Sequence, residues 1–404
     1  EYQINADGVS ASFIGFGFCT EENIVIASTF KGLPVTQMRN EAFLCGMEPQ
    51  YCGNSYAKSI TVSDTVEEIY QGIFDLCPNL ESIYIGANVS FIRSFVANTL
   101  KGYNLAEIKV SPDNVYFSDN GNCLIEKQSK TLIVSCKNSV IPDDGSVEII
   151  GSMAFSLYPK KAIVIPEGVK RIEVTAFSDS ELEYVALPKS LTYLGAHVFE
   201  SCKNLQVVDL NGFTVNLTDA SKDGPLTVHG ELTVKNGTIE LTATKDRAFG
   251  SQSTVILNRG GNLTIESGKY IHHGGDSMAI TVDNSANSFG DAYLYVNGGE
   301  IISETYIAIR MRLEDPNANG NPGNGLSFVE VTGGYIFGAN RGIWGQKSSG
   351  ANELQGKLTV TGGTIENTRA DRGAIQIDTD SYAAQNMLVS ISGNADIKGA
   401  LKGG

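Results

Sequence analysis

Short segments in which apolar and polar residues alternate recur throughout the second half of the chain. They begin about 31 residues apart, at Leu232, Leu263, Leu294, Val329, Leu358 and Val389. Alternation with a period of two predicts a strand that buries one face. A fixed spacing of such strands, interrupted by inserts of variable length, predicts the stacked coils of a solenoid, in which each coil completes the core of its neighbour.

Each copy is followed by a glycine-containing corner and a second short apolar segment, as in Gly298-Gly-Glu-Ile301. Glycine adopts left-handed and close-packed corner conformations more readily than any other residue. A third apolar run follows later in the period, at residues 278–282, 307–311, 341–344 and 372–377. The pattern therefore predicts three strands in each coil.

The first half of the chain spaces its apolar positions differently. Segments 60–74, 163–177 and 185–199 each contain a short strand pattern, a turn with Pro or Ser, a second apolar pair and a Phe. In the second of these, Ile163 and Ile165 point to one side of a strand, while Val169, Ile172 and Phe177 fill the interior of the coil. The spacing predicts a second, different array of β-rich coils.

These repeats resemble the BspA-like leucine-rich repeats of bacterial surface proteins, whose units read I-x-I-P-x-x-V-x-x-I-x-x-x-A-F-x-x-C-x-x-L. The resemblance covers residues 1–206. Residues 24–43 look like the usual first unit, and residues 110–134 look like the hairpin insertion of the family. The resemblance implies a leucine-rich repeat solenoid and a secreted or cell-surface location. The chain opens at Glu1 without a signal segment, and we expect that segment to have been removed.

Residues 209–215, Asp-Leu-Asn-Gly-Phe-Thr-Val, resemble a phrase that often opens β-helix regions in bacterial surface proteins. No Pro- or Ser-rich linker precedes it, so a continuous or tightly docked junction is expected near residue 206. Residues 207–404 resemble the pectin-lyase-like class of right-handed parallel β-helices. The expected fold is thus mainly β: a leucine-rich repeat domain over residues 1–206, followed by a right-handed parallel β-helix over residues 207–404.

The charge and composition of the chain argue against some classes of binding partner. The chain has 404 residues and a net charge of −15, which argues against nucleic acid and anionic membrane surfaces as partners. No apolar run approaches the about 20 residues of a membrane span, so no membrane insertion is expected, and we expect a monomer. Seven cysteines are too few for a disulfide scaffold. Free core thiols are expected, with pairing of Cys45 with Cys52 or of Cys123 with Cys136 as alternatives.

Many proteins of the β-helix class cut acidic polysaccharides, so signatures of such enzymes were sought. The polygalacturonase-like phrases N-T-D, D-D, G-H-G and R-I-K, and the pectate-lyase-like R-x-P-x-x-R, do not occur as a set in this sequence. No phosphate-binding loop, nucleophile elbow or dinucleotide fingerprint is present. A polysaccharide lyase or hydrolase is therefore an alternative, and no catalytic residue is assigned.

Four arginines fall at related phases of successive coils, and they predict a basic ladder along one face: Arg310, Arg312, Arg341 and Arg372. Such a ladder suits a carboxylated or sulfated glycan, whereas ion pairs with Asp371 and Glu314 would make it a plain solvated face. Trp344 is the only tryptophan. With Tyr293, Tyr295, Tyr335 and Phe337 it would form a sugar-stacking platform, or it would pack into the structure.

Two segments carry residue types that bind metals. His272 and His273 precede Asp276, but adjacent residues of a strand point in opposite directions, so binding one ion would require a loop. Asp315, Asn317 and Asn319 have the spacing that begins a calcium loop, whose twelfth position is Leu326 instead of Glu. Calcium is the only cofactor the sequence suggests, and an ordinary insertion explains this loop as well.

The sequence predicts a secreted or cell-surface bacterial protein that binds a host protein, a matrix component or a glycan. A polysaccharide-active enzyme is one alternative. A structural spacer within a larger surface protein is another, because a solenoid offers a long surface with or without a ligand.

Overall fold

The computed structural model describes residues 1–39, 54–70, 74, 77–92, 104–195, 197–210, 214–218, 226–228, 231–242, 254–258, 260–274, 278–283, 291–313, 326–347, 353–378 and 384–403. The chain forms two compact units. The N-terminal unit contains residues 1–160 and 166–180, and the C-terminal unit contains residues 161–165 and 181–404. No helix in the described part of the chain is long and apolar enough to span a membrane.

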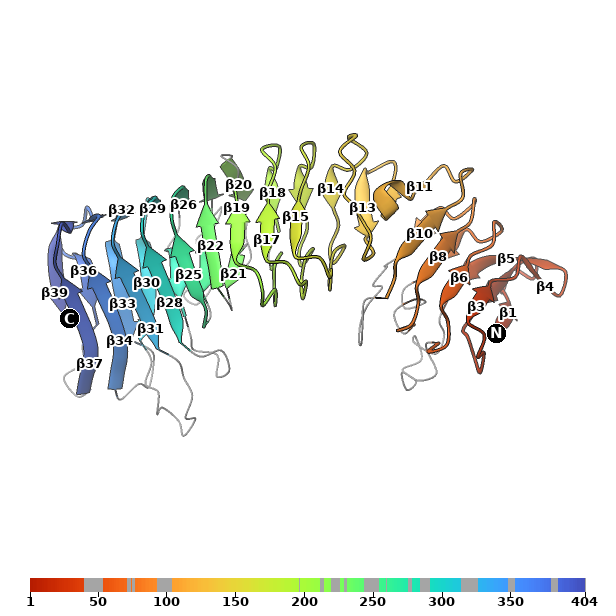
Figure 1. Ribbon diagram of the computed structural model, residues 1–404, viewed down its shortest axis with the longest axis horizontal. Helices are drawn as coiled ribbons and strands as arrows, with labels where there is room; N and C mark the ends of the chain where they lie inside the picture. The colour runs from red at the N-terminus through yellow and green to blue at the C-terminus, as the bar shows by residue number, and fades with distance from the viewer. Residues whose placement is uncertain are drawn as a thin grey trace. The chain divides into compact units, whose positions relative to one another are not determined.

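The first coils of the N-terminal unit build two ladders of short strands (Figure 1, red to orange). One ladder runs β1 (Tyr2–Ile4), β2 (Ala11–Phe13), β5 (Leu33–Met38), β7 (Glu68–Ile69) and β9 (Phe91–Ile92), with β4 (Thr29–Phe30) paired to β5. The other runs β3 (Asn23–Val25), β6 (Ser59–Thr61), β8 (Ser82–Ile85) and β10 (Glu107–Val110). Only β1 with β2 and β4 with β5 are antiparallel within these ladders.

A hairpin interrupts the coils where the sequence predicted an insertion. Strands β11 (Phe117–Ser118), β12 (Leu124–Glu126) and β13 (Thr131–Val134) pair in antiparallel fashion, with the short 3-10 turn η2 (Asn120–Asn122) before β12. Parallel pairing then resumes from β13 to β14 (Ile149–Ile150) and β16 (Arg171–Ile172). The predicted hairpin is confirmed.

The core of the N-terminal unit is built from the positions that repeat. Ile60 and Ile83 stand in register on neighbouring strands and are almost fully buried. Phe155 and Phe177, one repeat apart, are fully buried and stack with their ring centroids 5.1 Å apart. Buried rings contribute strongly to stability because each removes a large apolar area from water.

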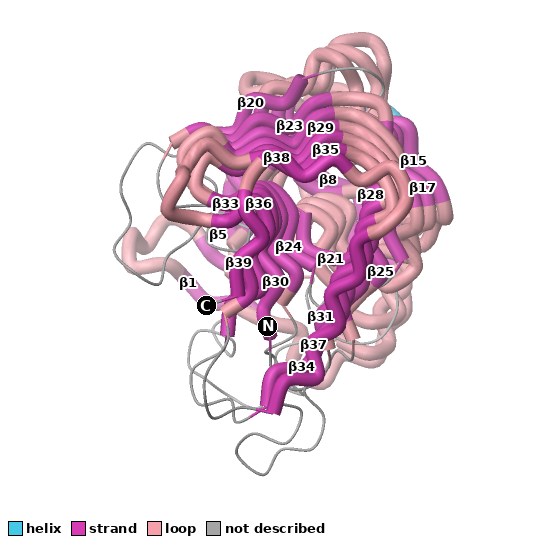
Figure 2. Tube along the Cα trace, turned by 90° about the vertical axis from the view of Figure 1, so that its left-hand side faces the viewer, coloured by secondary structure: helices cyan, strands magenta, loops and turns pink. Residues whose placement is uncertain are grey.

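The C-terminal unit consists of three parallel sheets that stand side by side and each receive one strand per coil. Figure 2 shows them as three separate rows of strands when the stack is viewed from its C-terminal end. Sheet I contains β15 (Ala162–Val164), β17 (Tyr184–Ala186), β19 (Val207–Asp209), β22 (Glu231–Lys235), β25 (Asn262–Ile265), β28 (Ala292–Val296), β31 (Ser327–Val331), β34 (Glu353–Val360) and β37 (Ala384–Ile391).

Sheet II contains β20 (Thr214–Thr218), β23 (Thr238–Thr242), β26 (Lys269–His273), β29 (Glu300–Ser303), β32 (Tyr335–Gly338), β35 (Thr364–Glu366) and β38 (Asp396–Lys398). Sheet III contains β21 (Leu226–Val228), β24 (Thr254–Asn258), β27 (Met278–Val282), β30 (Ile307–Leu313), β33 (Arg341–Lys347), β36 (Gly373–Ile377) and β39 (Ala400–Gly403). The short strand β18 (Tyr193–Leu194) precedes the three-sheet coils. The three strands per coil that the apolar pattern predicted are confirmed.

Sheet I runs without interruption through the predicted domain boundary. Val208 of β19 stands in register with Val185 on one side and with Val234 on the other. A strand from a coil with the shorter repeat therefore pairs directly with a strand from a coil with the longer repeat. The division at residue 206 into a leucine-rich repeat domain and a following domain stays a prediction.

The glycine corners are explained by close contact between coils. Gly268, Gly299, Gly334 and Gly363 occupy the same position of successive coils, with φ of +91°, +77°, +86° and +78°. A Cβ on Gly268 would lie 2.4 Å from the carbonyl oxygen of Gly237 in the preceding coil. Left-handed backbone and this lack of space together require glycine at the corner between sheets I and II.

None of the described cysteines, Cys19, Cys77, Cys123, Cys136 and Cys202, forms a disulfide. All but Cys19 are buried, and burial raises the pKa of the Cys123 thiol to about 12. The expected core thiols without disulfides are therefore confirmed for these four buried cysteines, and the alternative pairing of Cys123 with Cys136 is wrong. Cys45 and Cys52 lie outside the described residues.

Candidate functional site: a basic face with one tryptophan

Two of the predicted site residues, Arg310 and Trp344, lie on the outer face of sheet III. Ile309, Ile343 and Ile375 stand in register and fill the core, so the residues next to them point away from it. Arg310 on β30 is in register with Trp344 on β33, which is in register with Gln376 on β36. Arg310 and Trp344 are half-buried, so the structure brings these two predicted site residues side by side.

Arg341 lies at the start of β33 and is only 6 % exposed. Its guanidinium carbon sits 4.6 Å from the centre of the Trp344 ring, at the distance of a cation–π contact. Its Nε donates to Oε1 of Gln376 at 2.9 Å, and its Nη1 donates to Oδ1 of Asn340 at 3.0 Å. These bonds hold Arg341 in place beneath the outer surface of the sheet.

Trp344 is fixed by a further bond, because its Nε1 donates to Oδ1 of Asp378 at 2.9 Å. One face of the indole ring meets Arg341, and its polar edge meets a carboxylate. Trp344 therefore has a defined orientation on the face.

The other two predicted arginines differ in their surroundings. Arg372 is 40 % exposed, and its Nε lies 3.6 Å from Oδ2 of Asp371, which also binds Arg369. Arg312 lies 3.3 Å from the carboxylate of Asp283 and is in register with Gln346, two residues beyond Trp344. Arg312 thus lies farther along the strand.

Two other arginines lie within electrostatic reach of Arg341. Burial lowers the pKa of Arg341, and the nearby charges of Arg372 and Arg369 lower it further, against the opposing effects of Tyr306 and Asp378. A shift in this direction means that the cation is destabilised by like charge. A bound anion would relieve that repulsion, which is notable in a chain whose net charge is −15.

The aromatic residues do not form a single platform with Trp344. Tyr293 and Tyr295 lie on sheet I, Tyr335 and Phe337 on sheet II, and Trp344 on sheet III. Tyr293, Tyr295 and Tyr335 face outward as predicted, and both they and Phe337 are half-buried. Tyr293 stacks on Phe328 of the next coil with ring centroids 4.6 Å apart, so one face of its ring is covered. The predicted combined platform is therefore wrong, because three sheets point its members in three directions.

The candidate calcium residues Asp315, Asn317 and Asn319 lie outside the described residues, as do Glu314, Asp276 and Asp380. Within the described ranges no group of three His, Cys, Asp or Glu side chains could hold a metal ion. His272 and His273 point to opposite sides of β26: His272 is fully buried, and His273 lies outside with Nδ1 2.8 Å from Glu304 and Nε2 3.6 Å from Glu240. Geometry within the strand thus separates the two imidazoles.

His272 should make the C-terminal unit less stable in mild acid. Burial lowers its pKa to about 4, and the charge of His273 adds to this. The unfolded chain then binds a proton more readily than the folded chain between about pH 6.5 and pH 4. We expect the free energy of unfolding at pH 5 to be about 2 kcal/mol lower than at pH 7.5 on account of this residue. Denaturant unfolding of His272→Phe and of the parent at both pH values measures the difference, and an equal pH dependence would contradict it.

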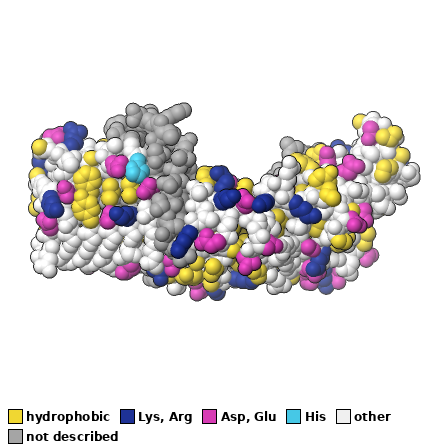
Figure 3. All heavy atoms as spheres, turned by 90° about the horizontal axis from the view of Figure 1, so that it is seen from above, with side chains coloured by type: hydrophobic (Ala, Val, Ile, Leu, Met, Phe, Trp, Pro, Cys, Tyr) yellow, Lys and Arg dark blue, Asp and Glu magenta, His cyan; other side chains and the backbone are white. Residues whose placement is uncertain are grey.

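Sheet II carries an apolar stripe on its outer face that the alternation pattern did not predict. Ile271, Ile302 and Phe337 stand in register on the outer face and are half-buried. Charged pairs flank them, including Lys269 with Glu300 at 2.8 Å. Figure 3 looks onto this side of the molecule, where hydrophobic side chains gather among acidic and basic ones. The sequence does contain a sign of this stripe. In Tyr270-Ile271 and in Ile301-Ile302, two apolar residues follow each other, so one of them must face outward.

About half of the chain matches a known family of repeats. Residues 22–123 and 125–222 match the BspA type leucine rich repeat region, in six copies. No curated protein of related sequence was found.

Among solved structures, the chain is similar to a leucine-rich repeat protein from Eubacterium ventriosum, with 18 % identity over 66 % of this chain and 83 % of that one, at a TM-score of 0.35. The pneumococcal vaccine antigen PcpA matches with 16 % identity over 73 % and 91 %, at a TM-score of 0.32. A leucine-rich repeat protein from Bacteroides ovatus matches with 14 % identity over 97 % and 88 %, at a TM-score of 0.30.

The matched segment includes every described strand from β3 to β20, and it carries the Phe and Ile positions that fill the N-terminal core. Residues 22–123 and 125–222, about half of this chain, are thus similar to the BspA type leucine rich repeat region.

Proposed function

We propose that the chain is a secreted or cell-surface bacterial binding protein, and that residues 207–404 form a right-handed parallel β-helix of the pectin-lyase-like class. The three parallel sheets with one strand per coil support the β-helix assignment. The BspA-type repeats support a surface location, since the family resemblance implies one. Adhesion to a host protein, a matrix component or a glycan would use the long outer faces that stacked coils provide.

We propose further that the ligand of the C-terminal unit is a carboxylated or sulfated glycan bound at the basic face of sheet III. The observation that carries this proposal is that Arg369 and Arg372 both lie within electrostatic reach of the buried Arg341. Guanidinium groups bind carboxylate and sulfate oxygens through paired hydrogen bonds. The side chain of Arg372 is 40 % exposed, against 29 % for Arg312. It is therefore the group we expect to contact the ligand.

Arg372→Gln should weaken binding of an anionic glycan about tenfold, because a hydrogen bond to a charged group contributes about 1.5–3 kcal/mol. A glycan array with the intact chain, run with and without calcium, would identify the ligand, and titration calorimetry would measure affinity. Lys357→Gln, which removes an exposed charge on sheet I, is the matched control and should leave affinity unchanged.

An array without any acidic glycan among its hits would overturn the glycan proposal and favour adhesion to a protein or a spacer role. Affinity that is equally high in Arg372→Gln and Arg310→Gln would place the ligand elsewhere on the molecule. Mass spectrometry of the bound glycans distinguishes a binder from the alternative, a polysaccharide lyase or hydrolase, because only an enzyme would shorten them.

A further inference from the structure

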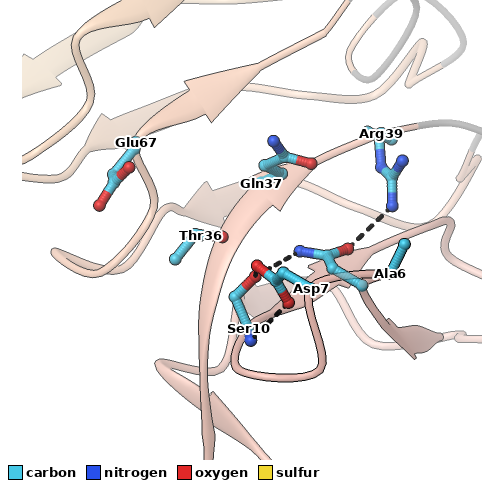
Figure 4. Close-up of a pocket in the computed structure, with 8 residues that line it drawn as sticks. Ala6, Asp7, Ser10, Thr36, Gln37, Arg39 and Glu67 are labelled. Atoms are coloured by element: carbon cyan, nitrogen blue, oxygen red, sulfur yellow. Dashed lines mark hydrogen bonds between the residues drawn. The ribbon is translucent and has the colours of Figure 1, made fainter.

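The N-terminal unit carries an open pocket of 350 Å³ beside the turn that joins β1 to β2 (Figure 4). Its polar lining includes Asn5, Asp7, Ser10, Thr36, Arg39 and Glu67. These residues come from the β1–β2 turn, from β5 and the residue after it, and from the residue before β7. The volume is near the lower end of the about 300–1,000 Å³ range of small-molecule sites.

Hydrogen bonds fix one wall of the pocket. Oδ1 of Asp7 accepts from the backbone N–H groups of Val9 at 2.9 Å and Ser10 at 3.0 Å, and Oδ2 accepts from the Ser10 hydroxyl. Asn5 Nδ2 donates to Ser10 Oγ at 2.8 Å, and Arg39 Nη2 donates to Asn5 Oδ1 at 2.9 Å. Figure 4 shows this chain of bonds running from Asp7 to Arg39. Groups held in this way lose little entropy when a ligand binds.

Hydrogen-bonding capacity is left over on both sides of the pocket. Arg39 lines one wall with a guanidinium that has N–H groups besides the one bonded to Asn5. Glu67 is exposed and offers two carboxylate oxygens from the opposite side. A donor on one wall and acceptors on the other can both be satisfied by hydroxyl groups, which donate and accept.

The residues that line the pocket disfavour anions, simple cations and apolar molecules as ligands. Hydrogen bonds from the Ser10 side chain and the Val9 backbone lower the pKa of Asp7, so its carboxylate stays ionised and, with Glu67, disfavours an anion. Arg39 disfavours a simple cation. The lining has Ala6 as its one apolar residue, so an apolar ligand would lose its contact area.

We infer that this pocket binds one unit of a neutral, polyhydroxylated saccharide. Arg39 would donate to a ring or hydroxyl oxygen, while Asp7 and Glu67 would accept from neighbouring hydroxyls. The site lies in a different unit from the basic face of sheet III, and it takes a ligand of different charge. Its existence therefore does not depend on the anionic glycan proposed for the other unit.

Ligand-observed saturation-transfer NMR with the intact chain tests the inference, using the methyl glycosides of glucose, galactose, mannose and N-acetylglucosamine as probes. We expect saturable binding of at least one probe. Glu67→Gln should weaken that binding about fivefold or more, because an ionised acceptor makes a stronger hydrogen bond than an amide. Glu67 is exposed, so this variant should fold normally.

Glu107→Gln, which changes an exposed glutamate of the same unit, is the control and should bind as the parent does. The inference is overturned if none of the four probes binds saturably. It is also overturned if both Glu67→Gln and Arg39→Gln keep the affinity of the parent chain.

Discussion

Phe177→Ala should lower the free energy of unfolding of the N-terminal unit by about 3–5 kcal/mol. The ring is fully buried and stacks on Phe155, which in turn meets Tyr158 edge-on at 5.0 Å. Truncation removes the transfer free energy of the ring and leaves a cavity between coils, which cannot collapse because the backbones of both coils are held by strand pairing. Calorimetric unfolding of the variant and the parent measures the loss.

Phe18→Ala is the matched control for this prediction. It makes the same chemical change in the same unit, but Phe18 is 93 % exposed and buries little area. We expect a change within about 0.5 kcal/mol for the control. Equal effects of the two variants would show that the repeated Phe does not hold the coils together.

Gly268→Ala should destabilise the C-terminal unit by about 3 kcal/mol or more. Two costs add at this corner. An alanine in the left-handed region is strained at a φ of +91°, and its Cβ would lie 2.4 Å from the Gly237 carbonyl oxygen. The obstructing atom belongs to the backbone of the preceding coil, so relief requires the coils to separate.

Gly145→Ala isolates the first of these costs. Gly145 has a φ of +80°, and a Cβ there would meet nothing within 4 Å. The control should lose only about 1–2 kcal/mol, which is the strain of the left-handed conformation alone. Thermal unfolding followed by calorimetry compares the two variants with the parent, and similar losses in both would disprove the proposed role of contact between coils.

The strands could be predicted from the sequence because the apolar pattern of each repeat recurs several times along the chain. The third strands expected at 278–282 and 307–311 are β27 (Met278–Val282) and β30 (Ile307–Leu313), which confirms the first and extends the second by two residues. A single copy of Leu-x-Val would be ambiguous, but six copies fix which positions face the core and which glycine turns the corner. The hairpin insertion was predictable for the same reason, since it interrupts a pattern that resumes after it.

The candidate site was predictable only in part. Alternation places Arg310 and Trp344 on the outer face of the same sheet, and register then makes them neighbours. It could not show that Arg341 is buried against Trp344 and bonded to Gln376, because that depends on the side chains of two other coils. Nor could it tell that Tyr293, Tyr335 and Trp344 belong to three different sheets, since the angle between sheets is not encoded in a period of two.

The polar pocket near Arg39 left no periodic signal at all. Its residues precede or flank the first regular coils, and they meet because β1 folds back antiparallel on β2 before the parallel ladder begins. Asp7 and Ser10 form an ordinary turn in the sequence, and only the fold brings Glu67 to the opposite wall.

The unbroken pairing of sheet I has a mechanical consequence for the C-terminal unit. Hydrogen bonds between neighbouring strands point across the strands, which is the direction in which the coils are stacked. A pulling force applied between the two ends of that stack acts along these bonds, so it opens them a few at a time, as in unzipping, and does not shear whole strands past one another. The unit would lengthen coil by coil under modest tension, and the register of the coils still in place would guide each released coil back when the tension falls.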